Sequence, residues 1–152
     1  MIAFLIVIVL AFCLMELVSY AVHRFLYHKI FWKIHKSHHA PREGAFELND
    51  VFPLFFACAS IAVIMAGIAA GPWSLMFAVG LGVTGYGLVY FVVHDLYVHH
   101  RVKILSLRIR LFRALKRAHA THHRTGGEPY GLLFYPQFQN AHHTALPEEG
   151  TP

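Results

Sequence analysis

"MIAFLIVIVLAFCLMELVSYAV", residues 1–22, carries one charged side chain, Glu16, in an otherwise apolar stretch. An α-helix rises about 1.5 Å per residue, so this stretch is long enough to cross the roughly 30 Å hydrocarbon layer of a bilayer. A cleaved secretory signal is the alternative. It is disfavoured because no Lys or Arg precedes the apolar run and no small-residue cleavage pattern ends it. We therefore interpret residues 1–22 as a membrane-spanning helix.

Two further apolar stretches, residues 51–70 and 73–93, predict two more spanning helices, joined as an antiparallel hairpin by the short Gly71-Pro72 turn. Hydrophobic residues make up 57% of the 152-residue chain and charged residues 14%, which indicates burial in lipid rather than in a soluble core. The predicted fold is an all-α integral membrane helical bundle. It forms one domain over residues 1–140, followed by a flexible tail over 141–152.

The basic residues lie asymmetrically around these spans. None precedes the first span or lies in the turn at Gly71, and all 13 follow the first or the third span. Because positive segments are retained in the cytoplasm, we expect a multi-pass membrane protein with both of its long polar segments in the cytoplasm. The N-terminus and the hairpin turn would lie outside, and every histidine would lie on the cytoplasmic side. Membrane orientation thus explains the net charge of +5, and no nucleic-acid partner is expected.

Residues 102–118 mix apolar side chains such as Leu105 and Phe112 with arginines and lysines. This pattern is typical of a basic amphipathic helix on the inner leaflet, where the cations contact anionic membrane lipid. Docking of an acidic electron donor on the same surface is a compatible second interpretation. Cys13 and Cys58 lie inside apolar stretches, so we interpret them as packing residues and expect no disulfide.

Histidines carry the strongest chemical signal of the sequence. The pattern HxxxxH followed by HxxHH occurs twice, as "HRFLYH" with "HKSHH" and as "HDLYVH" with "HATHH". The repetition predicts two half-sites of one metal centre. The ten candidate ligands are His23, His28, His35, His38, His39, His94, His99, His119, His122 and His123. Three others, His100, His142 and His143, are expected not to be ligands, although His100 remains ambiguous as the neighbour of His99.

The spacing within these motifs bears on the number of ions. Positions i, i+3 and i+4 share one face of a helix, so each HxxHH group can converge. An i, i+5 pair diverges by about 140° on an ideal helix and needs a helix end, a distortion or two different ions. We favour two ions, because ten imidazoles are too many for the four to six positions around one. No thiolate is available near the histidines to favour zinc or copper(I). A pair of irons beside a membrane suggests oxygen activation.

The order of "HRFLYH", "HKSHHAPREGAFELND", "GYGLVYFVVHDLYVH" and "AHATHH" resembles the bacterial β-carotene hydroxylases. These enzymes are a branch of the fatty acid hydroxylase and sterol desaturase superfamily of non-haem di-iron membrane proteins. The histidine boxes match the superfamily, whereas "GAFELND" and the "HD" of the third box narrow the resemblance to this branch. It covers the chain from about Glu16 to Tyr135, with a departure at His100, where a glutamine is usual.

This resemblance implies a cytoplasmic histidine-rich cap that binds two Fe ions through the ten histidines. It also implies hydroxylation of the β-ionone rings of β-carotene at carbon 3, through β-cryptoxanthin to zeaxanthin. O2 is the co-substrate, and a ferredoxin-type protein is the electron donor. Three alternatives remain: a hydroxylase or desaturase of another membrane lipid such as a fatty acyl chain or sterol, a metal-binding or transport membrane protein, and a bis-histidine haem protein.

Two carboxylates are further candidate site residues. Glu16 lies seven residues before His23, about two helical turns, and therefore faces the same site from within the membrane. The alternative is an interfacial residue that attracts water or an arginine. Asp95 follows His94 and is expected to orient this imidazole from behind, unless it forms a surface pair with an arginine. Asn49 and Asp50 are interpreted as helix capping rather than as site residues.

Small and aromatic residues near the third span have two interpretations each. We interpret Tyr86, Tyr90, Phe91 and Tyr97 as packing and interfacial anchors, with the lining of a hydrophobic channel as the alternative. "GLGVTG", residues 80–85, follows no strand, so we expect it to allow close helix approach or to leave a slot for a flat polyene rather than to bind a dinucleotide.

Overall fold

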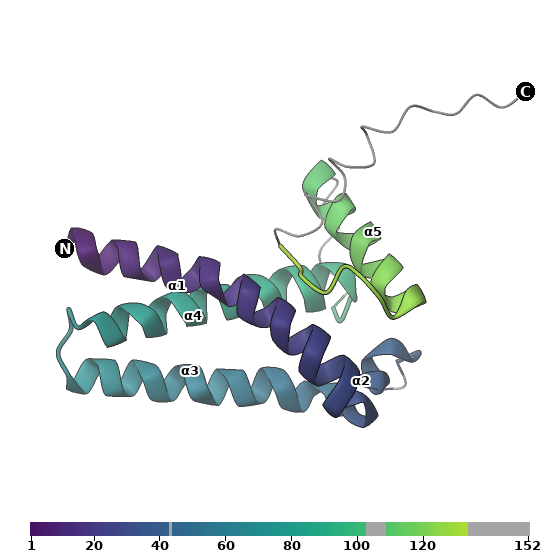
Figure 1. Ribbon diagram of the computed structural model, residues 1–152, viewed down its shortest axis with the longest axis horizontal. Helices are drawn as coiled ribbons and strands as arrows, with labels where there is room; N and C mark the ends of the chain where they lie inside the picture. The colour runs from purple at the N-terminus through teal and green to yellow at the C-terminus, as the bar shows by residue number, and fades with distance from the viewer. Residues whose placement is uncertain (43, 103–108, 134–152) are drawn as a thin grey trace, which may run out of the picture.

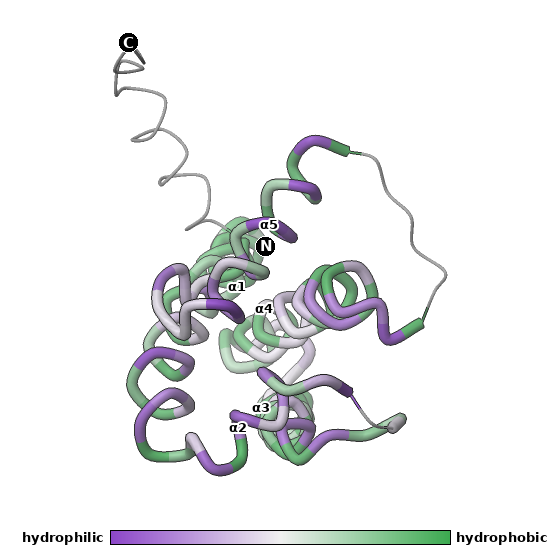
Figure 2. Tube along the Cα trace, turned by 90° about the vertical axis from the view of Figure 1, so that its right-hand side faces the viewer, coloured by the Kyte–Doolittle hydropathy of each residue, from purple (hydrophilic) through white to green (hydrophobic). Residues whose placement is uncertain are grey.

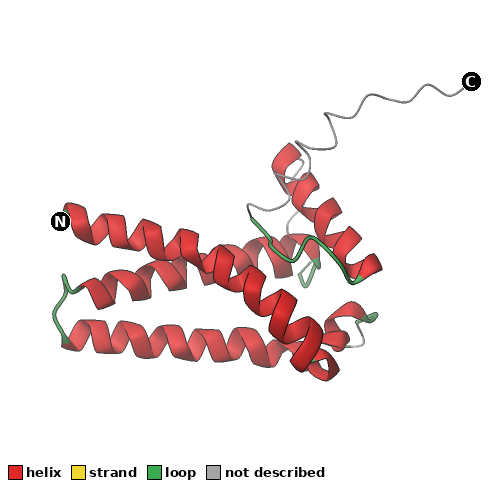
Figure 3. Cartoon of the chain, in the orientation of Figure 1, coloured by secondary structure: helices red, strands yellow, loops and turns green. Residues whose placement is uncertain are grey.

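The computed structural model describes residues 1–42, 44–102 and 109–133. Every regular element within these ranges is helical and none is a strand, which confirms the predicted all-α class (Figure 3). The elements in chain order are α1 (Ile2–Ala21), η1 (Val22–Ile30), α2 (Trp32–His39), η2 (Leu48–Asp50), α3 (Val51–Ala69), α4 (Leu75–Tyr90), η3 (Phe91–Val98) and α5 (Arg110–Thr125). The expected tail over 141–152, with His142 and His143, lies outside the described residues.

Three helical segments are long and apolar enough to cross a membrane: Ile2–Ile30, Leu48–Ala69 and Leu75–Val98. They confirm the three predicted spans and support a membrane protein. The first and third are longer than expected, because α1 continues without a break into the π-helix η1, and α4 into the π-helix η3. Both extensions carry polar histidines. The apolar pattern in the sequence therefore ends before each helix does.

The three spans form a layer in which α4 lies between α1 and α3 and packs along both (Figure 1). Large apolar side chains such as Leu5, Leu54 and Leu88 are more than half exposed, as expected for helices that face lipid, and the spans are mostly hydrophobic in Figure 2. Gly82 permits the close approach of α4 to α1, because a Cβ there would lie 2.5 Å from the carbonyl oxygen of Ile8. The predicted role of "GLGVTG" in close helix approach is thus confirmed at Gly82.

The helices that carry the histidines gather at one end of the bundle, opposite the turn between α3 and α4 (Figure 1). α5 differs from the expected helix over 102–118. It begins at Arg110, residues 103–108 lie outside the described part, and it continues through the last histidine box to Thr125. It ends where Gly126 adopts a left-handed conformation with φ +68°, a common helix terminator. The expected end at 118 was wrong because the buried face of the last turns consists of polar histidines, which interrupt the apolar period.

Candidate metal centre

The two HxxxxH motifs lie in the two π-helices. η1 holds His23 and His28, and η3 holds His94 with His99 directly after it. The backbone bonds show the wider turn: the His99 N–H donates to the His94 carbonyl at 2.9 Å, five residues back. Residues five apart therefore lie one above the other. Of the three explanations considered for the i, i+5 spacing, a local distortion of the helix therefore brings each pair together.

The described histidines form two groups in which all potential ligand atoms lie within 4.8 Å of one another. The first group consists of His23, His28, His35, His39 and His122, and the second of His38, His99, His119 and His123. His94 adjoins the second group, since its Nε2 lies 3.2 Å from Nε2 of His38. All ten predicted residues are therefore brought together, whereas His100 is exposed and contacts Lys116.

Each HxxHH triplet is divided between the two groups. On α2, His35 and His39 belong to the first group and His38 to the second; on α5, His119 and His123 belong to the second and His122 to the first. Successive residues of a helix are rotated by about 100°, so position i+4 lies about 40° from i in one sense of rotation, and position i+3 lies about 60° from i in the opposite sense. Each half-site of the sequence therefore contributes one histidine to the other group: His38 belongs to the second group and His122 to the first.

The outer ring nitrogens of five histidines face oxygen acceptors. Nδ1 of His23 lies 2.8 Å from the Tyr130 carbonyl and Nδ1 of His122 lies 2.6 Å from the Gly127 carbonyl. The corresponding acceptors are Asn49 for His35 at 2.7 Å, Glu47 for His38 at 3.1 Å and Asp95 for His94 at 3.3 Å. Because these oxygens only accept, each Nδ1 carries the proton, and Nε2 of the neutral ring presents a lone pair.

In two pairs of histidines these lone pairs face one another. Nε2 of His23 lies 3.1 Å from Nε2 of His35, and Nε2 of His38 lies 3.2 Å from Nε2 of His94. Further pairs of Nε2 atoms are separated by 3.1 Å for His28 with His122, 3.3 Å for His39 with His35 and 2.9 Å for His99 with His119. Two facing lone pairs repel, whereas a cation between them is attracted to both. This donor set therefore favours a shared metal ion.

The spacing also fits metal ligands. Nitrogens about 2.0–2.1 Å from one ion, at angles between a right angle and a tetrahedral one, are roughly 2.9–3.4 Å apart. The observed separations of 2.9–3.3 Å lie in this range. In addition, Nε2 of His123 is buried without a hydrogen-bond partner among the described residues, which is costly for a polar atom with no other role.

Burial keeps these imidazoles neutral. His122 is fully buried, and His35 and His119 are 3% and 5% exposed. Desolvation lowers the pKa of His35 and of His123 to about 3, and that of His122 to about 4. Neighbouring imidazoles lower the pKa of all three further, because a second positive charge would be repelled. At pH 7 the rings thus hold the neutral form that metal binding requires.

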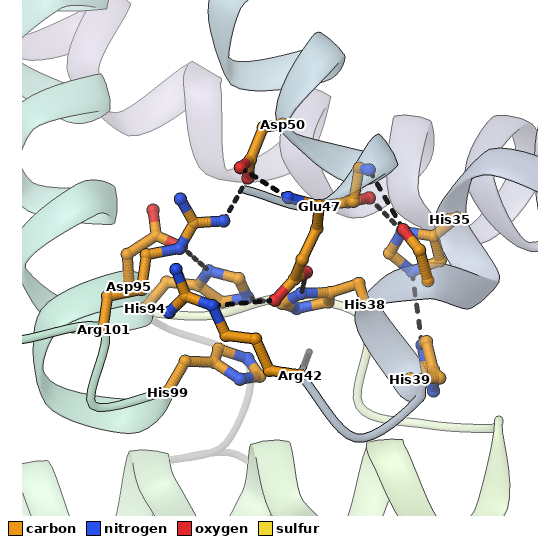
Figure 4. A network of polar contacts seen from close by, with 12 residues as sticks. His35, His38, His39, Arg42, Glu47, Asp50, His94, Asp95, His99 and Arg101 are labelled. Atoms are coloured by element: carbon orange, nitrogen blue, oxygen red, sulfur yellow. Dashed lines mark hydrogen bonds and ion pairs between the residues drawn. The ribbon is translucent and has the colours of Figure 1, made fainter. Parts of the chain in front are cut away.

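Glu47 and Asn49 support the histidines of α2 and were not predicted as site residues. Figure 4 shows the Glu47 carboxylate between His38 and Arg42, whose Nε lies 3.7 Å from Oε1 of Glu47. Asn49 accepts a hydrogen bond from His35. The capping interpretation is wrong for Asn49, but Asp50 does accept from the Glu47 backbone N–H at 3.0 Å. A signal was available: these polar side chains follow the histidine box within a short loop, where acceptors for ligand imidazoles are expected.

Asp95 combines both roles that the sequence left open. It is 8% exposed, with Oδ1 3.3 Å from Nδ1 of His94 and 3.4 Å from Nε of Arg101. Arg101 also contacts Asp50 at the start of α3 (Figure 4). This ion-pair network ties the end of η3 to the loop that carries Glu47.

Glu16 is 4% exposed, which does not fit an interfacial residue that attracts water, and its role at the site stays a prediction. Its Oε1 accepts from the backbone N–H groups of Leu132 and Leu133 and its Oε2 from the Tyr86 hydroxyl, each at 2.8 Å. It thereby fastens the segment after α5 to the first span. Since Tyr130 of this segment accepts from His23, Glu16 positions the first histidine group indirectly.

Glu47→Gln should weaken metal retention by roughly 10–100-fold, the usual effect of losing a carboxylate that holds a ligand imidazole. The amide retains the shape but not the charge that favours the proton on Nδ1 of His38. Metal content measured by mass spectrometry of the purified protein checks the prediction. Arg42→Gln is the control, because it removes the cation and leaves the bond between Glu47 and His38. Equal metal content in both variants would contradict the role of Glu47.

A cavity of about 470 Å³ lies between α1, α3 and α4 and reaches the histidines. The side chains at its polar end are those of His23, His35, His38, His94, Asn49, Asp50 and Asp95. The rest of its lining is mostly apolar. Tyr86, Tyr90 and Phe91 line it, so the channel interpretation that we ranked second holds for these three. Tyr97 does not line it and packs edge to face on Phe112, with ring centroids 5.1 Å apart.

Sequence comparisons agree with this architecture. The chain is 39% identical to the β-carotene hydroxylase of Pseudescherichia vulneris over 84% of its own length and 74% of that protein's. It is 37% identical to the β-carotene hydroxylase of Pantoea ananas, over 90% and 79% of the two chains. It is also 39% identical to the chloroplastic β-carotene 3-hydroxylase of Gentiana lutea, over 81% of this chain and 40% of the plant protein.

No solved structure was found to match the chain. The family described as Fatty acid hydroxylase matches residues 8–144, which include all ten histidines, most of the first span and the whole of the other two. With its relatives aligned over most of its length, the chain belongs to the fatty acid hydroxylase family.

Proposed function

We propose that the protein hydroxylates the β-ionone rings of β-carotene at carbon 3, first to β-cryptoxanthin and then to zeaxanthin. The observation that carries this proposal is the position of ten imidazoles, in two groups, at the end of an apolar cavity between membrane-spanning helices. The names of the relatives supply the substrate class. For each hydroxyl group, the substrate, O2, two electrons and two protons give the alcohol and one water.

We further propose that the ten histidines hold two Fe ions. His23, His28, His35, His39 and His122 would bind one, and His38, His94, His99, His119 and His123 the other. Iron, when bound, supplies the activation of O2 that insertion of oxygen into an unactivated C–H bond requires. The protein keeps the ligand nitrogens deprotonated through burial and through the acceptors on Nδ1, among them Glu47 and Asp95.

The cavity would place the ring beside the histidines. Its wall on α4 and η3 extends from Val83 to Asp95, twelve residues or about 18 Å along a helix. Its volume is too small for a whole carotene, so the rest of the polyene would leave between the spans into lipid. A substrate that is insoluble in water thereby enters from the bilayer, while O2 and electrons arrive from the aqueous side.

We place the histidine end in the cytoplasm and the protein in the bacterial inner membrane. η1, α2, η3 and α5 share one end of the bundle (Figure 1), and the basic residues near the spans lie on these elements and the loops beside them. The turn between α3 and α4, at the opposite end, has no basic residue. The positive-inside rule then orients the bundle with the N-terminus outside.

The second candidate is hydroxylation or desaturation of a fatty acyl chain or sterol, favoured by the broad family match and by the mostly apolar lining of the cavity. A metal transporter fits less well. Transport requires ligands near the middle of the membrane, and here they lie together at one end of the bundle.

Expression in bacteria that accumulate β-carotene tests the proposal. We expect β-cryptoxanthin and zeaxanthin in the extracted pigments, with one 18O atom per new hydroxyl group when the cells grow under 18O2. Unchanged β-carotene in cells whose protein is inserted and loaded with iron would overturn the carotene assignment. Lipid profiles of the same cells would then reveal a hydroxylated or desaturated acyl chain or sterol.

A further inference from the structure

The outward face of α5 is a stripe of arginines. Arg110, Arg113, Arg117 and Arg124 are all exposed, and at about 100° per residue they fall within roughly 60° of one another around the helix. The opposite face of the same helix carries His119 and His122, which are buried. One helix thus separates these four residues, which we call the arginine stripe, from the histidine groups.

The arginine stripe has no counter-charge among the described residues. The five described carboxylates are all engaged elsewhere: Glu16 with Tyr86 and the backbone of Leu132 and Leu133, Glu47 with His38 and Arg42, Asp50 and Asp95 with Arg101, and Glu128 with Arg24. Four unpaired guanidinium groups on one face attract an anionic partner and accelerate its association.

A bilayer surface is the less suitable partner. A helix that lies on a membrane inserts its apolar face into the lipid. Most of the apolar face of α5 is already used inside the protein, because Leu115 is 3% exposed and packs with Val93 and Leu132, and Phe112 packs on Tyr97. Leu111 is 45% exposed but lies more than about 90° around the helix from the arginine stripe. The arc of the arginine stripe itself holds no large apolar side chain. What remains exposed there is charge with hydrogen-bond donors, a surface that fits an acidic protein.

We propose that the arginine stripe docks an acidic protein that carries single electrons. The inference rests on the proposed function, in which each hydroxylation consumes two electrons from outside the chain. A carrier bound to the stripe would face His119, His122 and His123 across about 10–12 Å, the thickness of one helix. The forked guanidinium group also suits recognition of carboxylates, since it can donate two parallel hydrogen bonds.

The test uses the full-length protein in phosphatidylcholine vesicles and a reduced plant-type [2Fe–2S] ferredoxin as the acidic probe. Two double variants have the same change in net charge: Arg113→Glu with Arg117→Glu on the stripe, and Lys33→Glu with Lys36→Glu on the exposed side of α2. Binding of the ferredoxin is measured by cosedimentation with the vesicles. Hydroxylation is measured separately with ferredoxin and with dithionite-reduced methyl viologen, which needs no docking surface.

We expect the stripe variant to weaken ferredoxin binding about tenfold or more at low salt, to raise the KM for ferredoxin by a similar factor, and to retain viologen-driven activity. Binding to the unmodified protein should weaken steeply as salt increases from about 20 to about 200 mM. Equal binding by the stripe variant and the unmodified protein would overturn the proposal, and so would an equal loss in the α2 variant.

Two other results separate the alternatives. Repeating the assay in vesicles with anionic lipid tests the membrane: a viologen-driven defect of the stripe variant that appears only there would assign the stripe to lipid headgroups and overturn carrier docking. Absence of hydroxylation with either reductant would contradict the proposed function instead. The binding measurement still decides the role of the stripe in that case, because it requires no turnover.

Discussion

His122→Ala is expected to abolish hydroxylated pigment, with a loss on the order of 100-fold or more, and to lower the iron content from about two ions per chain to about one. His122 is fully buried, its Nε2 lies 3.1 Å from Nε2 of His28, and its Nδ1 is held by the Gly127 carbonyl. Loss of a ligand should exceed the 10–100-fold effect typical of the groups that orient one. Pigment analysis of the carotene-producing cells and metal analysis of the purified protein check the two parts.

His100→Asn is the matched control. His100 lies on the same side of the bundle but is exposed and outside both groups, and its φ of +50° is one that asparagine adopts readily. Iron content and pigment should be unchanged in this variant. His38→Ala repeats the experiment on the second group, because His38 is the residue of α2 that crosses to it. Full activity in either His122→Ala or His38→Ala would exclude the corresponding residue as a ligand.

Spacing in the sequence was sufficient to predict which ten histidines the fold brings together, because the signal is local and repeated. It was not sufficient to assign each histidine to one of the two groups. The direction of His38 and His122 depends on how α2 and α5 are rotated against η1 and η3, and this rotation is set by packing between distant segments. The π-helical turns were anticipated only as one of three ways to bring an i, i+5 pair together, since no residue type marks a π-helix reliably.

Part of the support for the histidines came from residues that are distant in sequence. Glu16 accepts from backbone groups 116 and 117 positions away, and His23 bonds to a carbonyl 107 positions away. A carboxylate inside a membrane span is expected to have hydrogen-bond partners, but its position in the sequence does not predict which residues they are. Glu47 lies only nine residues after His38, yet its loop conformation, and therefore its direction, did not follow from the pattern of side chains.

The spans were predictable because lipid imposes length and apolarity, whereas the cavity between them was not. A hydropathy pattern distinguishes apolar from polar residues. It does not distinguish a tightly packed interface between helices from one that encloses a cavity. Gly87 shows the difference. It lines the cavity, and a Cβ placed on it would meet no atom within 4 Å, whereas the same atom on Gly82, five residues earlier on α4, would collide with α1.

Gly87→Phe is therefore expected to reduce hydroxylation of β-carotene about tenfold or more, with insertion and iron content unchanged. The new ring has open space in front of it, so it would occupy the cavity rather than displace a helix, and it would exclude the end ring of the substrate. A series of Ala, Leu and Phe at this position should lower zeaxanthin in the order of side-chain volume. Extracted pigments are compared at equal amounts of inserted protein.

Val89→Phe provides the matched control, because Val89 lies two residues further on the same helix, is 37% exposed and does not line the cavity. It adds the same aromatic ring to the lipid-facing surface and should leave the pigments unchanged. If Gly87→Phe also left zeaxanthin at its original level, the ring would have to reach the histidines by another route. If both variants lost activity together, the loss would reflect the bulk added to α4, and the cavity would have no special part in it.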